Sequence, residues 1–82
     1  MNKIVLKING MKCGMCEAHV NDLFRKSIKV KSIKSDHKKN QTIIICENDY
    51  TKEELNKCLD GSGYIIEDIL KETAKKTLLG WR

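Results

Sequence analysis

Hydrophobic residues change their spacing several times along this chain of 82 residues, and the order of the changes limits the fold more than any other feature. Residues 3–9 alternate, so that Ile4, Leu6 and Ile8 share one face, which is typical of a strand buried on one side. Residues 16–27 then place apolar side chains at helical spacing, with acidic residues early and basic residues late, as the helix dipole favours. A strand followed by a helix is therefore expected.

The rest of the chain repeats these signals. Residues 28–36 and 41–47 are rich in β-branched side chains and are joined by a polar tract that suits a hairpin. Thr51 with Glu54 three residues later forms a capping box that starts a second helix, and residues 64–70 are expected to form a fourth strand. The order βαββαβ predicts a ferredoxin-like α+β sandwich, a four-stranded antiparallel sheet with two helices on one face.

A chain of this length holds one small domain, which we assign to residues 1–70. Residues 71–82 are expected to form a helical tail. Its Leu78, Leu79 and Trp81 would cover the sheet face that the helices leave open, or the same face of a second copy in a homodimer. A homodimer that forms through a shared metal site is the other arrangement that we consider. That open face is expected to carry an apolar strip formed by Val5, Ile44, Cys46, Ile65 and Ile69.

The composition narrows the class of partner and the compartment. Sixteen Lys and Arg against eleven Asp and Glu give a net charge of +5, which suits an acidic partner, but aromatic residues at 5% provide no stacking platform for nucleic acid. The longest apolar run, residues 43–46, is too short for a membrane span, and lysines interrupt the N-terminal stretch. We therefore expect a soluble, cytoplasmic chain without membrane insertion. In that reducing compartment its four cysteines are more typical of metal ligands, redox groups or buried hydrophobes than of disulfides.

Two of these cysteines, Cys13 and Cys16, stand between the first strand and the first helix in the sequence GMKCGMC. A cysteine on the loop and another in the first helical turn can direct both sulfurs to one point, and a helix N-terminus stabilises thiolate. Thiolates are soft ligands that suit Cu(I), Zn(II) and other soft ions. Lys12 adds a positive charge beside them.

The sequence GMKCGMC resembles the GMxCxxC hallmark of the heavy-metal-associated domain family, which comprises small copper chaperones and the N-terminal modules of metal-transporting ATPases. The resemblance covers residues 3 to about 70. It includes the helix residues Val20 and Leu23 and the pair Gly63-Tyr64 before the fourth strand.

The resemblance implies a role for each residue of the site. Cys13 and Cys16 would bind one Cu(I), Met11 would pack beneath the loop as part of the core, and Tyr64 would lie beside the metal. Bacterial members often carry tyrosine at the position of Tyr64, where eukaryotic chaperones tend to carry lysine, so the chain is similar to bacterial copper chaperones. Zinc-transporting relatives tend to have aspartate where Lys12 stands, which favours Cu(I) over Zn(II) or another soft metal here.

Further histidines and cysteines are secondary candidates. His19 follows Cys16 by three residues on the same helical face, so it is either a third ligand, a partner contact or a solvent-facing side chain. His37 falls in the hairpin at the same end of the domain, where a solvated side chain is expected. Cys46 and Cys58 are expected to be small buried hydrophobes.

The function that we predict is a non-enzymatic carrier that binds Cu(I) through Cys13 and Cys16 and passes it to a partner protein with an acidic face, such as a metal-transporting ATPase. Lys12, Lys38 and Lys39 would form the basic docking face for that partner.

Other functions remain open at this point. The sequence from Cys13 to Cys16 is close to the CGxC of thioredoxin-type oxidoreductases, but those enzymes resemble one another in a cis-proline beside the cysteines, and this chain has no proline. A structural zinc site would need two more ligands, and Cys46 and Cys58 lack the paired spacing of such sites. An interaction domain with a vestigial site is the third alternative.

Overall fold

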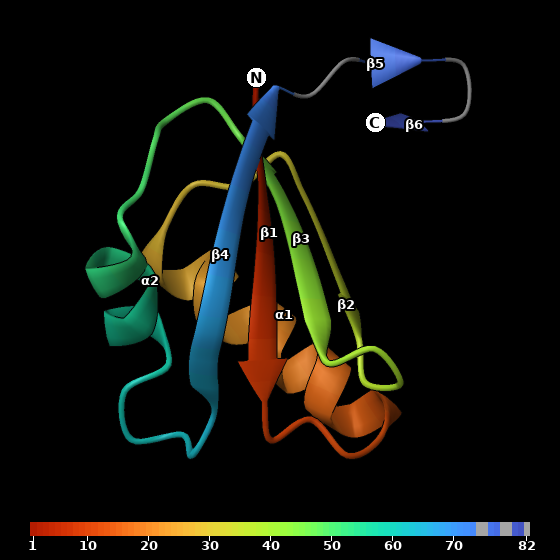
Figure 1. The fold of residues 1–82 in the computed structure, drawn as a ribbon, viewed down its shortest axis with the longest axis vertical. Coiled ribbons are helices and arrows are strands. Elements are labelled where there is room, and N and C mark those ends of the chain that lie inside the picture. The colour runs from red at the N-terminus through yellow and green to blue at the C-terminus, as the bar shows by residue number, and fades with distance from the viewer. Residues whose placement is uncertain (74–75, 78–79, 82) are drawn as a thin grey trace.

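The computed structural model describes the backbone of residues 1–73, 76–77 and 80–81 and the side chains of residues 1–73. The elements are β1 (Asn2–Asn9), α1 (Gly14–Ser27), β2 (Ser32–Asp36), β3 (Gln41–Cys46), α2 (Lys52–Cys58), β4 (Ile65–Thr73), β5 (Lys76–Thr77) and β6 (Gly80–Trp81). A four-stranded antiparallel sheet has the order β2-β3-β1-β4. Both helices cover one face of this sheet (Figure 1). The predicted ferredoxin-like βαββαβ sandwich is confirmed.

Strand β1 lies between β3 and β4, and its alternating sequence is what suits it to that position. Ile4, Leu6 and Ile8 are fully buried and form the centre of the core together with Val20 and Phe24 of α1. Burying side chains of this size stabilises the fold by about 1.5–3 kcal/mol each. The core is completed by Met11, Ile33, Ile44, Cys46, Leu55, Leu59 and Ile66.

Helix α1 begins at the cysteine motif itself, two residues before the start that the hydrophobic spacing indicates. The carbonyl of Cys13 accepts hydrogen bonds from the backbone N–H groups of Cys16 (3.0 Å) and Glu17 (3.3 Å), which close the first turn. Cys13 is the N-cap, and its side chain makes no capping hydrogen bond within the part of the chain that the structure describes. The two cysteines therefore lie on one hydrogen-bonded turn.

Helix α2 has the predicted capping box. The N–H of Glu54 donates to Oγ1 of Thr51 (3.1 Å), and the N–H of Thr51 donates to Oε1 of Glu54 (3.5 Å). Leu55 and Leu59 then pack into the core, and the chain turns toward β4 through Gly61 and Gly63, both with positive φ. Among the described residues, no helix is long and apolar enough to cross a membrane.

The prediction of a helical tail over residues 71–82 is wrong for the residues that the structure describes. Residues 71–73 extend β4, where Thr73 is the register partner of Asn2, while β5 and β6 pair with each other as a short antiparallel ladder. Because β1 begins at residue 2, its first residues offer partners that continue β4 beyond its expected end. The predicted placement of Leu78 and Leu79, and that of the Trp81 side chain, lie outside the described residues.

The apolar strip predicted for the open sheet face is wrong in three members. Ile44 and Cys46 are fully buried in the core, and Ile69 packs against that core, because Ile44 is the register partner of Ile4, and Ile69 that of Leu6. Val5 pairs instead with Ile43 and Leu70. The open face thus carries Val5, Ile43, Ile45, Ile65 and Leu70.

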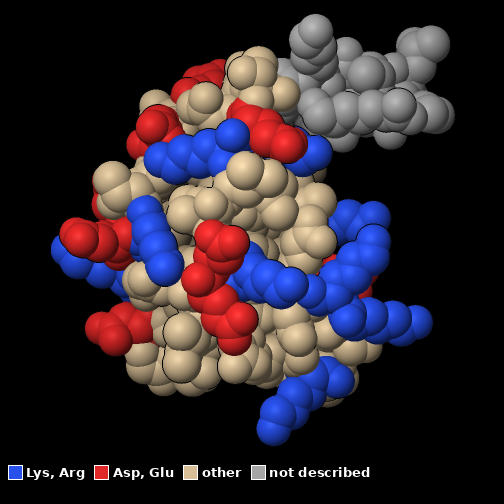
Figure 2. Space-filling view, viewed as in Figure 1, with Lys and Arg blue, Asp and Glu red and all other residues tan. Residues whose placement is uncertain are grey.

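For Ile69, the physical reason for this error is an irregular register between β1 and β4, whereas Ile44 and Cys46 follow the regular pairing of β3 with β1. Between Lys7 and Ile8 the pairing of β1 with β4 shifts by one residue, which leaves Glu67 as an extra residue in β4. The alternation of faces is interrupted there, so Ile66 and Ile69 both face the helices. Figure 2 looks onto the open face, where uncharged surface is interrupted by both acidic and basic side chains.

Candidate metal centre

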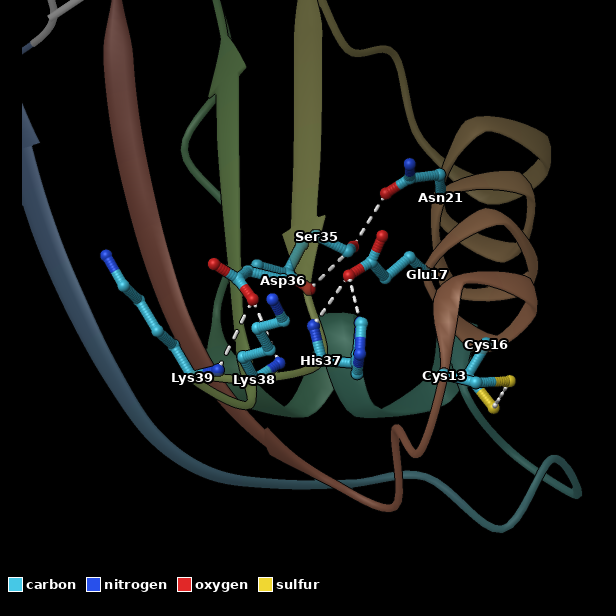
Figure 3. Close-up of polar contacts among 10 residues, drawn as sticks. Cys13, Cys16, Glu17, Asn21, Ser35, Asp36, His37, Lys38 and Lys39 are labelled. Carbon is cyan, nitrogen blue, oxygen red and sulfur yellow. Dashed lines mark hydrogen bonds and ion pairs between the residues drawn. The ribbon is translucent and has the colours of Figure 1, made fainter.

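The two motif sulfurs lie close together at the exposed N-terminus of α1. Sγ of Cys13 and Sγ of Cys16 are 3.9 Å apart, and Figure 3 shows both side chains directed to the same side of the turn. Two thiolates that bind one ion at about 2.3 Å each are at most about 4.6 Å apart, so this pair needs no rearrangement of the backbone to share an ion. Cys13 is exposed and Cys16 is half-buried, and both thiols are free.

The surroundings of Cys16 favour its thiolate form. Its pKa is lowered from 9.0 to about 7, first by a backbone hydrogen bond from Lys12 and then by the side chain of Tyr64. Hydrogen bonds to the charged form explain the direction, because they stabilise the thiolate, which is the form in which a cysteine binds a metal ion. Lys12 thus acts on this thiol through its main chain, and its exposed ammonium is a separate feature of the surface.

Met11 and Gly10 shape the floor of the loop. The structure places Met11 in the core, with 4% of its surface exposed. Gly10 has φ +110°, a conformation that side chains rarely adopt, and a Cβ on it would lie 3.2 Å from Cδ1 of Tyr64. The glycine is therefore required by both its backbone and the ring that lies against it.

Tyr64 and His19 form a pair beside the cysteines. The phenol oxygen of Tyr64 lies 3.2 Å from Nδ1 of His19, and the rings meet edge to face. Within residues 1–73, the one group of three or more potential ligand atoms within 4.8 Å of one another consists of Glu17, Asp36 and His37, so the structure does not bring His19 together with both sulfurs at that range.

The hairpin between β2 and β3 is tied to the same helical turn, a contact that sequence reasoning missed. Oε2 of Glu17 accepts hydrogen bonds from the backbone N–H of His37 (2.8 Å) and from its Nδ1 (2.6 Å), as Figure 3 shows. Both bonds lower the pKa of the Glu17 carboxyl. The predicted topology could have indicated this contact, because it puts His37 at the same end of the domain as Glu17, the residue that follows Cys16.

Three further hydrogen bonds support this hairpin. Oδ1 of Asp36 accepts the backbone N–H groups of Lys38 (2.9 Å) and Lys39 (3.4 Å), which fixes the turn. Ser35 donates to Oδ1 of Asn21 in α1 at 2.6 Å. The basic side chains predicted for docking are exposed here, and in Figure 2 Lys and Arg gather on the side of the sheet where β2 and β3 lie.

Cys46 and Cys58 belong to other surroundings. Cys46 lies at the end of β3 opposite the hairpin, and its thiol donates to the carbonyl of Asn48 at 3.0 Å. Cys58 ends α2, and its thiol donates to the carbonyl of Glu54 at 3.4 Å. Burial raises the pKa of both thiols, which makes them poorer metal ligands than Cys16.

Known proteins match this chain in structure rather than in sequence. No family model and no curated protein matches its sequence. The CopZ metallochaperone superimposes with a TM-score of 0.64 at 19% identity, over 78% of this chain and 97% of that one. A heavy metal binding protein from Thermotoga maritima gives 0.68 at 17% identity, over 85% and 98%. The N-terminal domain of ZntA in its Zn(II) form gives 0.68 at 20% identity, over 90% and 96%. The chain therefore has the fold of the heavy-metal-associated domains, the family that its cysteine motif resembles.

Proposed function

We propose that this chain is a carrier that binds one Cu(I) ion between Cys13 and Cys16 and delivers it to a partner protein. The observation that supports it most is the pair of sulfurs 3.9 Å apart on one exposed helical turn. A pKa of about 7 for Cys16 provides thiolate at neutral pH, and thiolate sulfur is a soft donor that suits a soft monovalent ion.

The exposure of the site supports delivery rather than permanent storage. Cys13 is exposed, and Met15 between the cysteines is 83% exposed, so a thiolate from a partner can approach the ion before either sulfur of this chain releases it. The ion would then pass through an intermediate with ligands from both proteins. Among proteins of this fold, one is named a metallochaperone and another is a domain solved in a Zn(II) form.

The partner of this exchange would be an acceptor with an acidic face, such as a metal-transporting ATPase. Lys12 lies in the motif, and Lys38 and Lys39 lie on the hairpin that Glu17 and His37 hold against the same end. Opposite charges speed encounter and fix orientation, so transfer should slow as salt rises. We place this exchange in the cytoplasm, where thiols stay reduced.

The same geometry supports one alternative function, thiol-disulfide exchange. Two sulfurs at 3.9 Å with one thiol pKa near 7 also suit a dithiol oxidoreductase. Two assays on one preparation separate the functions. We expect the reduced chain to take one equivalent of Cu(I) from a chromophoric chelator and to leave the rate of insulin reduction by dithiothreitol unchanged. Insulin reduction without Cu(I) uptake would overturn the carrier proposal.

A further inference from the structure

Glu17, Asp36 and His37 form a cluster of three potential metal ligands apart from the cysteine motif. One atom of each side chain, a carboxylate oxygen or an imidazole nitrogen, lies within 4.8 Å of the other two, and all three residues are half-buried. The cluster joins the first turn of α1 to the end of β2 and the hairpin that follows it. Figure 3 shows the carboxylate of Glu17 directed toward the hairpin and the two cysteine sulfurs directed away from it. The cluster is therefore a separate feature from the cysteine pair.

Hydrogen bonds hold these side chains in place. Oε2 of Glu17 accepts the backbone N–H of His37 at 2.8 Å and lies 2.6 Å from Nδ1 of the same residue. Oδ1 of Asp36 accepts the backbone N–H groups of Lys38 and Lys39. An ionised carboxylate has about four lone-pair sites, so both carboxylates keep acceptor positions for a further partner. Donors that are already oriented lose little side-chain entropy when an ion binds between them.

The charge of the cluster is not balanced by a nearby lysine or arginine. Although the chain has a net charge of +5, the lysine ion pairs among the described side chains join Lys3, Lys31 and Lys71 to acidic residues elsewhere. Of the ion pairs in this part of the chain, the one that involves the cluster joins Glu17 to His37. Two carboxylates this close repel each other, and a divalent cation between them turns that repulsion into attraction.

The donor set determines the class of ion. Carboxylate oxygen and imidazole nitrogen are harder ligands than thiolate, and together they suit borderline divalent ions such as Zn(II). At bond lengths of about 2.0–2.2 Å, tetrahedral ligand atoms lie about 3.4 Å apart, so small side-chain rotations close the cluster around an ion. The neutral imidazole of His37 has one proton for two nitrogens. With that proton on Nε2, its Nδ1 can bind the ion in place of the hydrogen bond to Glu17.

We propose that Glu17, Asp36 and His37 form a second metal site, which binds one borderline divalent ion such as Zn(II) without the cysteines. The inference does not rest on the carrier function, because the two donor sets differ in chemistry and are directed to different sides of α1 (Figure 3). An ion bound there links the first turn of α1 to the hairpin that carries Lys38 and Lys39. The proposed docking face is then fixed by an ion other than the cargo.

The test uses the full chain with Cys13→Ser and Cys16→Ser, here called the serine background, because a dithiolate would also bind Zn(II). Three further variants each remove one ligand of the cluster: Glu17→Gln, Asp36→Asn and His37→Gln. His19→Gln is the matched control, because it removes the only other imidazole of the chain. Asp36→Asn keeps an oxygen that can accept the N–H groups of the turn, so the hairpin should fold in this variant.

The first measurement is calorimetric titration with Zn(II). The serine background should bind one equivalent, and each of the three ligand variants should bind at least about 10-fold more weakly. His19→Gln should bind like the serine background. No binding of Zn(II) by the serine background, or an unchanged affinity in Asp36→Asn, would overturn the proposal.

A second measurement identifies the donors directly. When the isotope-labelled serine background is titrated with Zn(II), NMR should show shifts of the ring nitrogens of His37 and none for those of His19. The melting temperature should rise with Zn(II) by mass action, and Asp36→Asn should abolish this rise. Shifts at His19 instead of His37, or a melting temperature that ignores Zn(II), would overturn the site. Because the motif cysteines are absent, these results hold whether or not the unmodified chain carries Cu(I).

Discussion

The carboxylate of Glu17 accepts two hydrogen bonds from one residue, His37, one from its backbone N–H at 2.8 Å and one from its ring Nδ1 at 2.6 Å. Glu17 directly follows Cys16 in the first turn of α1, whereas His37 lies in the hairpin between β2 and β3. This pair makes the turn that carries the cysteine motif and the basic hairpin one structural unit, although Glu17 and His37 are 20 residues apart in sequence.

This pair predicts a dependence of stability on pH. The hydrogen bonds from His37 lower the pKa of Glu17 below its ordinary value of 4.5, so the unfolded chain takes up a proton here before the folded chain does. The contribution of Glu17 is therefore fully present above that value and is lost as the pH falls below it. Glu17→Gln should flatten the decline of melting temperature in this acidic range, whereas Glu67→Gln on β4 is the control that should keep it. An equally steep decline in both variants would contradict the role of the pair.

The motif cysteines should be indispensable for Cu(I) and the other two dispensable. Cys13→Ser or Cys16→Ser leaves one thiolate, which cannot hold the ion against a chelator, because both sulfurs are needed for near-linear coordination. Cys46→Ala and Cys58→Ala change groups that hydrogen-bond to backbone carbonyls elsewhere, so they should keep full binding. The check is competition with a chromophoric Cu(I) chelator. Undiminished affinity in either serine variant would disprove the site.

Lys12 should favour Cu(I) over Zn(II). Two thiolates with a monovalent ion leave a net negative charge that a lysine offsets, whereas a divalent ion prefers further donors, often a carboxylate. Lys12→Asp should therefore narrow the difference between the affinities for Cu(I) and Zn(II). For Lys12→Ala, this difference should be intermediate between those of the original chain and Lys12→Asp. The affinities are compared by chelator competition for each metal. An original chain that holds Zn(II) as firmly as Cu(I) would show that the assigned metal is wrong.

Two glycines of the same loop should respond to alanine with opposite signs. Gly10→Ala forces a side chain into φ +110° and against the ring of Tyr64, which should cost on the order of 1–3 kcal/mol of unfolding free energy. Gly14 lies in α1, where a new Cβ would meet no described atom within 4 Å, so Gly14→Ala should stabilise by about 0.5–1 kcal/mol. Urea unfolding measures the change in unfolding free energy for both variants. Equal changes in the two variants would refute the strain predicted at Gly10.

The end of β4 should matter for stability but not for metal binding. A chain cut after Leu70 loses three register pairs with the start of β1, together with the ion pairs Lys3–Glu72 (3.5 Å) and Lys71–Asp49 (2.8 Å). It should melt at a lower temperature than a chain cut after Thr73. Both should keep Cu(I), because β4 ends at the opposite end of the domain from the start of α1 (Figure 1), where Cys13 is the N-cap. Equal melting temperatures would contradict the contribution of these pairs.

What the sequence predicts well is local. The alternation in β1, the capping box at Thr51 and the position of the motif between a strand and a helix each depend on a few neighbouring residues, and the structure has all three. Their order was enough for the fold, because the βαββαβ succession admits few arrangements.

What the sequence does not predict depends on pairing between distant segments. Residues 43–45 are all isoleucine, so their pattern does not tell which of them face the helices, and only the register with β1 decides it. The register shift near Ile8 and the extension of β4 likewise depend on how β1 and β4 pair, which neither strand's sequence determines alone. The contact of Glu17 with His37 requires a helix and a hairpin to be placed first.

Helix α1 starts at a cysteine whose side chain caps no backbone N–H among the described residues. Such a start leaves amide groups with partial positive charge and no side-chain acceptor. In the Cu(I) complex that we propose, a negatively charged dithiolate would lie at that end and supply the missing countercharge. The cargo would then also be part of the scaffold, because an ion bound at the start of the helix stabilises the helix in return. Handing over the ion would leave the donor with a looser first turn, so part of the free energy of each transfer would be conformational.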